Sequence, residues 1–271
     1  MSRLRSLGVI VGLTALTAVV VFPLYYAIAG SVMNYQDLTR FPPALIPTSV
    51  NVESFGRVFE SVPLARQYLN SIVVACSVVA AVLITSVLAG YAFTFLDFPY
   101  KKAVFGLTMA TLMVPAEATI LPNYLTISGW GLLNTYPGLF LPFLASGFGI
   151  FLMRQFFLSF PRELYEAARV EGSSHLRFVV SILVPLSKPA LSTLAIYTFI
   201  VTYNQYFWPL LVTNTPKMQT LQIGLSQLSS VDERTPNVVL AGVVLAVIPM
   251  LVILYVFQRQ IVRGLTQGAV K

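Results

Sequence analysis

A polar segment at residues 158–188 is the part of this sequence whose residue types and spacing could do chemistry. It contains Glu166-Ala167-Ala168-Arg169-Val170-Glu171-Gly172 and, after nine intervening residues, Ile182-Leu183-Val184-Pro185. Charged side chains next to small ones suit contact with another protein, because alanines let a partner's surface come close. A charged segment of this kind has no obvious role inside the lipid. The chemistry that the segment indicates is therefore docking to a partner in water.

Local signals predict a helix, a turn and a second helix in this segment. Pro161 suits the first turn of a helix, where its missing N–H has no intrahelical partner. Gly172 allows the positive φ that ends a helix, and Ser173 or Ser174 can cap the next one.

The first of these helices is predicted to be amphipathic. Leu164, Ala167 and Ala168 recur at helical spacing and could form one apolar face. Glu166 and Arg169 are left for water or for a charged partner. On composition alone, an ordinary loop with a solvated amphipathic helix is an equal alternative to docking.

A second set of polar residues lies inside an apolar stretch and could contact a transported molecule. Asn204, Gln205 and Trp208 would be costly in lipid without hydrogen-bond partners, so they must face protein, water or substrate. Amides and an aromatic surface suit a hydroxylated, sugar-like or choline-like cargo. Contacts between helices of this chain and a neighbouring subunit are an equal alternative.

Glu117 and Asn123 are further candidates for a substrate pathway. Glu117 follows Pro115 near the end of an apolar stretch, where it could face such a pathway. A neutralised structural carboxylate is an equally good reading of Glu117.

The sequence lacks the motifs of several enzyme classes. It has no G-x-x-x-x-G-K-[ST] phosphate loop, no H-E-x-x-H and no G-x-S-x-G. Without the phosphate loop, the chain has no visible means of hydrolysing ATP. The single cysteine, Cys76, and the single histidine, His175, exclude disulfides and a Cys- or His-rich metal site within the chain. Acidic residues are also too scarce in the apolar stretches for an ion-coupled pump.

Composition identifies the elements that must position these residues. The chain has 271 residues, of which 56% are hydrophobic and 10% charged, with a mean hydropathy of +0.78. Soluble domains carry about 25% charged residues, so we expect an all-α polytopic membrane protein. A membrane-spanning helix needs about 20 apolar residues. The stretches long enough for this are 8–31, 69–95, 104–125, 137–157, 189–212 and 237–257.

The distribution of basic residues predicts the orientation. With both termini in the cytoplasm, only five of the 17 basic residues fall outside, and the other twelve lie on inner segments, as the positive-inside rule requires. The net charge of +7 therefore indicates topology and not nucleic-acid binding. Ala27-Ile28-Ala29 resembles a signal-peptide cleavage site, but the apolar part is longer than the usual 7–15 residues, which favours an uncleaved first helix. The five outer residues are Arg40, Arg57, Arg66, Lys217 and Arg234.

The docking segment resembles the EAA loop of ABC importer permeases. Glu-Ala-Ala, the glycine at Gly172 and the Ile-x-Val-Pro sequence ending at Pro185 match the spacing of that loop, with Val184 where the family usually has leucine. The resemblance implies the type I importer permease fold with six spans. It also implies that the segment, including Arg169, docks on an ATPase subunit. Glu166 would pair with a basic residue there, Ala167 and Ala168 would allow close packing, and Gly172 would make the turn.

The carboxyl-terminal residues 258–271 resemble the tail of the maltose-permease G-type subunits. In that subfamily the tail reaches between the two ATPase subunits, which implies contacts by Gly264, Leu265, Thr266 and Gly268. A basic terminus near anionic lipid headgroups is the alternative.

A closer resemblance, over about residues 69–271, is to the E-type permease subunit of glycerol-3-phosphate and glycerophosphodiester importers. It is carried by residues 112–117, 153–157 and 203–211. The resemblance implies a bacterial inner-membrane subunit that imports such a cargo, for example glycerophosphocholine. Related permeases carry disaccharides and other oligosaccharides, and a self-contained secondary carrier is a remote alternative.

The same resemblance implies the partners. They would be a second six-span permease, two ATPase subunits, an external solute-binding protein and membrane lipid. The chain itself would not be an enzyme and would hold no cofactor, because ATP and magnesium would be bound by the ATPase.

Overall fold

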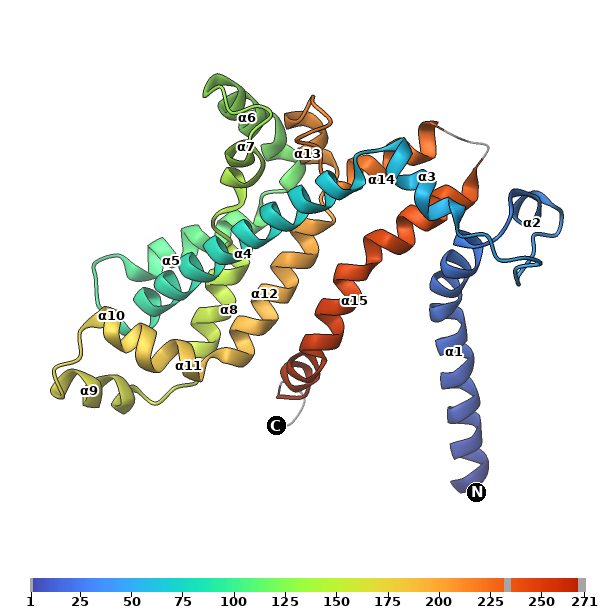
Figure 1. Ribbon diagram of the computed structural model, residues 1–271. Coiled ribbons are helices and arrows are strands. Elements are labelled where there is room, and N and C mark those ends of the chain that lie inside the picture. The colour runs from blue at the N-terminus through green and yellow to red at the C-terminus, as the bar shows by residue number, and fades with distance from the viewer. Residues whose placement is uncertain (1, 232–234, 268–271) are drawn as a thin grey trace. The chain divides into compact units, whose positions relative to one another are not determined.

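The computed structural model contains helices and no strand within residues 2–231 and 235–267, the residues that it describes, and it describes the side chains of 7–230 and 235–258. The chain divides into two compact units (Figure 1). Unit 1 comprises residues 1–65 and 221–249, and unit 2 comprises 66–220 and 250–271. The all-α membrane architecture expected from the composition is confirmed.

Unit 1 combines the first helix with a polar segment and the beginning of the last helix. The apolar helix α1 is followed by the short helices α2 and α3. The elements of unit 1 are α1 (Ser2–Ser31), α2 (Tyr35–Thr39), α3 (Glu53–Ser61), α14 (Leu221–Val231) and the part of α15 (Pro236–Gln267) up to Pro249.

Unit 2 contains the polar docking segment and most of the apolar helices. In Figure 1, α9, α10 and α11 gather at one end of this unit, and α6, α7 and α13 lie at the other end. Its elements are α4 (Leu64–Phe95), α5 (Lys101–Ala110), α6 (Ala116–Gly129), α7 (Tyr136–Phe140), α8 (Gly147–Phe157), α9 (Arg162–Val170), α10 (His175–Phe178), α11 (Val184–Leu186), α12 (Lys188–Tyr203), α13 (Phe207–Val212) and the part of α15 from Met250 on. Three further turns connect them: 3₁₀ turns at Thr111–Met113 and Leu141–Phe143, and a π-helical turn at Val179–Leu183.

Three helical segments, Leu7–Ser31, Leu64–Phe95 and Pro236–Gln258, are each long and apolar enough to cross a membrane unbroken. Three bent pairs bring the possible number of spans to six. The stretch predicted as a third span is broken by a bend of 97° between Lys101–Met113 and Ala116–Gly129. Pro115 lies at this break, where its ring removes a backbone donor and disfavours helix continuation.

The polar docking segment joins α12 through a second sharp break. Residues 175–186 form one continuous helical segment, and the chain bends by 82° between this segment and α12. Pro185 follows the π-helical turn, and Ser187 at the corner is fully buried. The Ser187 hydroxyl donates to the Leu183 carbonyl at 2.7 Å. The corner is thus held by packing as well as by the geometry of proline.

Helices α4 and α8 approach closely at Gly149. A Cβ atom added to Gly149 would collide with the Ser86 hydroxyl of α4 and would lie 3.3 Å from Leu194 of α12. Small residues allow such close approach between membrane helices, whose association depends on packing and not on the hydrophobic effect.

We expect Gly149→Val to destabilise the protein by about 1–3 kcal/mol, because the added methyl groups overpack this contact. The thermal unfolding midpoint of the detergent-solubilised chain measures the effect. Gly106→Val on α5 is the matched control, since an added Cβ there meets nothing within 4 Å. Equal midpoints for the two variants would contradict the packing role of Gly149.

Candidate functional site: the docking segment and a membrane cavity

The turn after α9 has the geometry that the sequence predicted. Gly172 has a φ of +79°. The backbone N–H of Ser173 donates to the Ala168 carbonyl at 2.9 Å, and the backbone N–H of Gly172 donates to the Arg169 carbonyl at 3.0 Å. These two bonds make a Schellman motif, which satisfies carbonyls that a helix end leaves unpaired. The predicted glycine turn is confirmed.

The next helix is capped by the second of the two predicted serines. The Ser174 hydroxyl accepts a hydrogen bond from the Arg177 backbone N–H at 3.3 Å, which satisfies a free donor of α10. Pro161 lies immediately before α9 in an extended conformation, so it stands one residue before the predicted first turn.

One face of α9 packs against the core of unit 2. Ala168 is 5% exposed, and the half-buried Leu164 and Tyr165 pack against the same core. The predicted apolar face is wrong at Ala167, which is exposed. Tyr165 takes its place, because position 165 lies on the Leu164–Ala168 side of the helix and its ring reaches the helices behind.

Behind α9, a cluster of aromatic rings joins three elements. It consists of Tyr91 and Phe95 of α4, Tyr165 of α9, and His175 and Phe178 of α10. The Tyr165 ring lies 5.2 Å from both Phe95 and Phe178. A hydrogen bond of 2.5 Å joins the Tyr91 hydroxyl to Nδ1 of His175. We call these five residues the aromatic anchor, because they attach α9 and α10 to the long helix α4.

The opposite face of α9 is exposed and charged. Glu166, Ala167 and Arg169 all lie on it. Glu166 is paired with Arg162 at 3.8 Å, and Arg162 also reaches Asp97 at 3.4 Å. Ion pairs this exposed contribute only about 0–1 kcal/mol, so a partner's basic residue could replace Arg162 at little cost. Glu166 can therefore exchange Arg162 for a basic residue of a partner, and the adjacent Ala167 leaves room for the partner's surface.

We expect Tyr165→Ala to lower the stability by about 1–3 kcal/mol, since its two closest ring pairs, with Phe95 and Phe178, are worth about 0.5–1.5 kcal/mol each. The unfolding midpoint of the solubilised chain measures this loss. Tyr100→Ala is the control, because Tyr100 is 82% exposed. A midpoint equal to that of the control would show that the anchor does not hold α9.

A second candidate site in unit 2 is a cavity of about 300 Å³ between α4, α8 and α12. It is lined by apolar side chains and by the polar side chains of Ser146, Tyr197, Thr198, Thr202 and Gln205. Oε1 of Gln205 is buried and has no hydrogen-bond partner. A buried amide oxygen without a donor is costly, so this cavity favours a hydroxyl-bearing or hydrated occupant.

Sequence comparison identifies the family. The model of the binding-protein-dependent transport system inner membrane component matches residues 81–267, which include the docking segment and Gln205. The chain belongs to this family. It is therefore a membrane component of an ABC importer, and the resemblance seen in the EAA-like segment is confirmed at the level of the family.

Known permeases match the chain over nearly its whole length. It is 40% identical over 259 residues to the sn-glycerol-3-phosphate transport system permease protein UgpE of Agrobacterium fabrum, covering 92% of each chain. It is 38% identical to the UgpE of Escherichia coli O1:K1, covering 93% of this chain and 92% of the relative. A bacterial ABC transporter that imports alginate shares the fold, with a TM-score of 0.85, 24% identity and coverage of 95% and 96%.

The other predicted pathway residues of this permease are not gathered at the cavity. Asn204 is exposed at the end of α12, where its amide donates to the Ile200 carbonyl at 2.9 Å. Trp208 is 4% exposed, and its indole N–H donates to the Gly138 carbonyl at 3.2 Å. Trp208 thus packs within this chain, whereas the sequence had left open a cargo contact or a contact with a neighbouring subunit.

Glu117 and Asn123 both lie on α6. Glu117 is exposed in the first turn, where the helix dipole favours a carboxylate, and Asn123 is half-buried. Of the predicted tail contacts, Gly264, Leu265 and Thr266 lie in the last turns of α15, and Gly268 lies outside the described residues.

Sequence reasoning missed the aromatic anchor. Tyr165 adjoins the Glu-Ala-Ala run, and His175 opens the next helix, but no local pattern connects either residue to Tyr91. Among the described residues no group of His, Cys, Asp and Glu side chains could hold a metal ion. His175 instead bonds to an aromatic neighbour.

Proposed function

We propose that this permease is one transmembrane half of an ABC importer for glycerol-3-phosphate or a glycerophosphodiester. A second six-span permease would complete the path, two ATPase subunits would bind on the cytoplasmic side, and an external solute-binding protein would deliver cargo. Six spans with both termini in the cytoplasm fit the bias of basic residues. The separation of α9–α11 from α6, α7 and α13 at opposite ends of unit 2 is consistent with one inner and one outer end (Figure 1).

The observation that carries the coupling role is the two-faced geometry of α9. Its outer face is charged and exposed, and its inner face is attached to α4 through the aromatic anchor. When ATP closes the ATPase dimer, α9 moves with the subunit on which it docks. Because Tyr165 packs on Phe95, this movement is passed to α4 and changes which side of the membrane the path faces. ATP and magnesium are bound by the ATPase subunits, and this chain holds no cofactor.

The cargo assignment is supported by the relatives and by the membrane cavity. Permeases named for sn-glycerol-3-phosphate transport match 92% of the chain at about 40% identity. The cavity near Gln205 adds hydroxyl groups from Tyr197 and Thr202 to an unpartnered amide oxygen, a set suited to a polyol. We propose that Gln205 is the pathway residue of this chain that contacts cargo hydroxyls.

Cargo-stimulated ATP hydrolysis by the assembled complex in proteoliposomes tests the proposal. We expect stimulation by glycerol-3-phosphate or by a glycerophosphodiester, in the presence of the binding protein. Stimulation by an oligosaccharide but by neither phosphate compound would overturn the cargo assignment. Transport by this chain alone, without ATP, would overturn the importer mechanism.

A further inference from the structure

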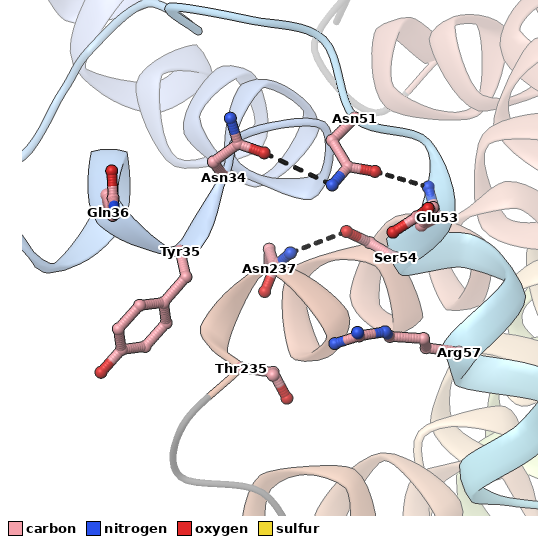
Figure 2. Close-up of a pocket in the computed structure, with 9 residues that line it drawn as sticks. All are labelled: Asn34, Tyr35, Gln36, Asn51, Glu53, Ser54, Arg57, Thr235 and Asn237. Atoms are coloured by element: carbon pink, nitrogen blue, oxygen red, sulfur yellow. Dashed lines mark hydrogen bonds between the residues drawn. The ribbon is translucent and has the colours of Figure 1, made fainter.

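Unit 1 contains a cavity of about 430 Å³ just outside the ends of two membrane helices (Figure 2). Helix α1 ends at Ser31, and α15 begins at Pro236. The cavity lies between the segment that follows α1, the helix α3 and the first turn of α15. Every residue that lines it has a polar side chain. A ligand there must therefore supply hydrogen bonds, and the cavity lies beside the ends of two helices that are long and apolar enough to cross a membrane.

Asn237 presents an unsatisfied amide to this cavity. Its side chain is 7% exposed, and Nδ2 donates to the Ser54 hydroxyl at 2.9 Å (Figure 2). Oδ1, the other end of the amide, has no hydrogen-bond partner. Whichever way the amide is oriented, one polar atom bonds to Ser54 and the other faces the cavity. A buried polar group of this kind requires a partner, which a ligand hydroxyl can supply.

Arg57 brings a positive charge to the same cavity. Glu53 lies one helical turn before it, at the spacing at which opposite charges usually pair. No ion pair within 4.0 Å joins the two among the described residues. In Figure 2 the Arg57 side chain instead extends toward Thr235 and Asn237. Its guanidinium is therefore available to an oxyanion, for which its planar set of donors is well suited.

The wall opposite Arg57 is already ordered by hydrogen bonds. The Asn34 side-chain oxygen accepts from Asn51 at 3.3 Å, and the Asn51 oxygen accepts from the Glu53 backbone at 2.8 Å (Figure 2). These contacts fix the position of the chain before α3 without involving Arg57 or the free end of Asn237. The cavity is thus formed in advance, which lowers the entropic cost of binding.

We propose that this cavity binds a glycerol phosphate group, with the phosphate at Arg57 and a glycerol hydroxyl at Asn237. The group could come from free glycerol-3-phosphate or from the headgroup of phosphatidylglycerol, since both present a phosphate and glycerol hydroxyl groups. The site lies in unit 1 and is separate in sequence from the Gln205 cavity of unit 2. Failure of glycerol-3-phosphate transport would therefore leave this inference intact.

Two binding measurements on the full-length chain in lipid nanodiscs distinguish the sources. The first titrates sn-glycerol-3-phosphate into nanodiscs of phosphatidylcholine by calorimetry. The second measures, by native mass spectrometry, how much phosphatidylglycerol the chain retains from mixed nanodiscs. The variants are Arg57→Gln, which changes an exposed side chain, and Asn237→Asp, which keeps the shape and repels a phosphate. Arg40→Gln is the matched control, because Arg40 is an exposed outer cation that does not line the cavity.

A free-ligand site predicts saturable binding that Arg57→Gln and Asn237→Asp each weaken at least about ten-fold, with Arg40→Gln within about two-fold of the parent. A headgroup site predicts no binding of the free compound, but a loss of retained phosphatidylglycerol of the same size in the same two variants. The proposal is overturned if neither compound binds, if Arg57→Gln has no effect, or if Arg40→Gln weakens binding equally. Equal weakening would mean diffuse attraction to the outer surface.

Discussion

Gly172→Val is expected to abolish cargo-stimulated ATP hydrolysis by the assembled importer while the chain still inserts in the membrane. Gly172 has a φ of +79°, a region that costs other residues about 1–2 kcal/mol and that a β-branched side chain strongly avoids. The substitution breaks the Schellman turn, so the orientation of α9 and of its charged face changes. We expect stimulated hydrolysis to fall by at least about ten-fold, which an ATPase assay on the purified complex measures.

Gly131→Val is the matched control for Gly172→Val. Gly131 has a φ of +69°, and an added Cβ there also meets nothing within 4 Å. The backbone strain is therefore similar, but Gly131 follows α6, at the other end of unit 2 from α9 (Figure 1). If both variants lose stimulation equally, general destabilisation explains the loss and the docking role of the turn is contradicted.

Ala167→Arg is expected to uncouple the importer without unfolding this chain. Ala167 is exposed in the isolated chain, so a larger side chain there meets only water until the ATPase docks. A bulky cation would then prevent close packing and would repel the basic residue that we expect to pair with Glu166. Stimulated hydrolysis should fall at least about ten-fold, and the unfolding midpoint of the chain should not change.

The adjacent alanine provides the comparison for Ala167→Arg. Ala168 is 5% exposed and packs against the core, so Ala168→Arg buries a charge and should lower the unfolding midpoint strongly. The two variants should thus distinguish a loss of docking, seen in ATP hydrolysis, from a loss of stability, seen in the unfolding midpoint. Normal stimulation with Ala167→Arg would show that the partner does not contact this face.

Local chemistry explains why parts of the docking segment could be predicted. Gly172 and Ser174 act through their own backbone geometry and hydroxyl, so their roles can be read from the residue type and its place in the pattern. The choice between Ala167 and Ala168 for the buried face could not be made in this way. It depends on where α4 lies, since the Tyr165 ring packs on Phe95, far away in the sequence.

In the membrane segments, too, some features can be predicted from the sequence and others depend on packing. Apolar length predicts where α4 and α15 run, because crossing lipid requires it. It predicts neither the 97° break at Pro115 nor the partner of Trp208, because proline is also tolerated inside straight helices and an indole N–H can bond to any nearby carbonyl. Gln205 and Trp208 are close in sequence, and both side chains carry groups that need hydrogen-bond partners. Only their packing separates a cavity residue from a core residue.

Disulfide cross-linking of α9 to the ATPase subunit tests the central claim most directly. The chain has a single cysteine, so Cys76→Ser gives a background without thiols. In that background, Ala167→Cys should cross-link to cysteines introduced on the cytoplasmic ATPase, and Gly131→Cys should not. A product from Gly131→Cys with none from Ala167→Cys would contradict the account, because the docking face would then not be on α9.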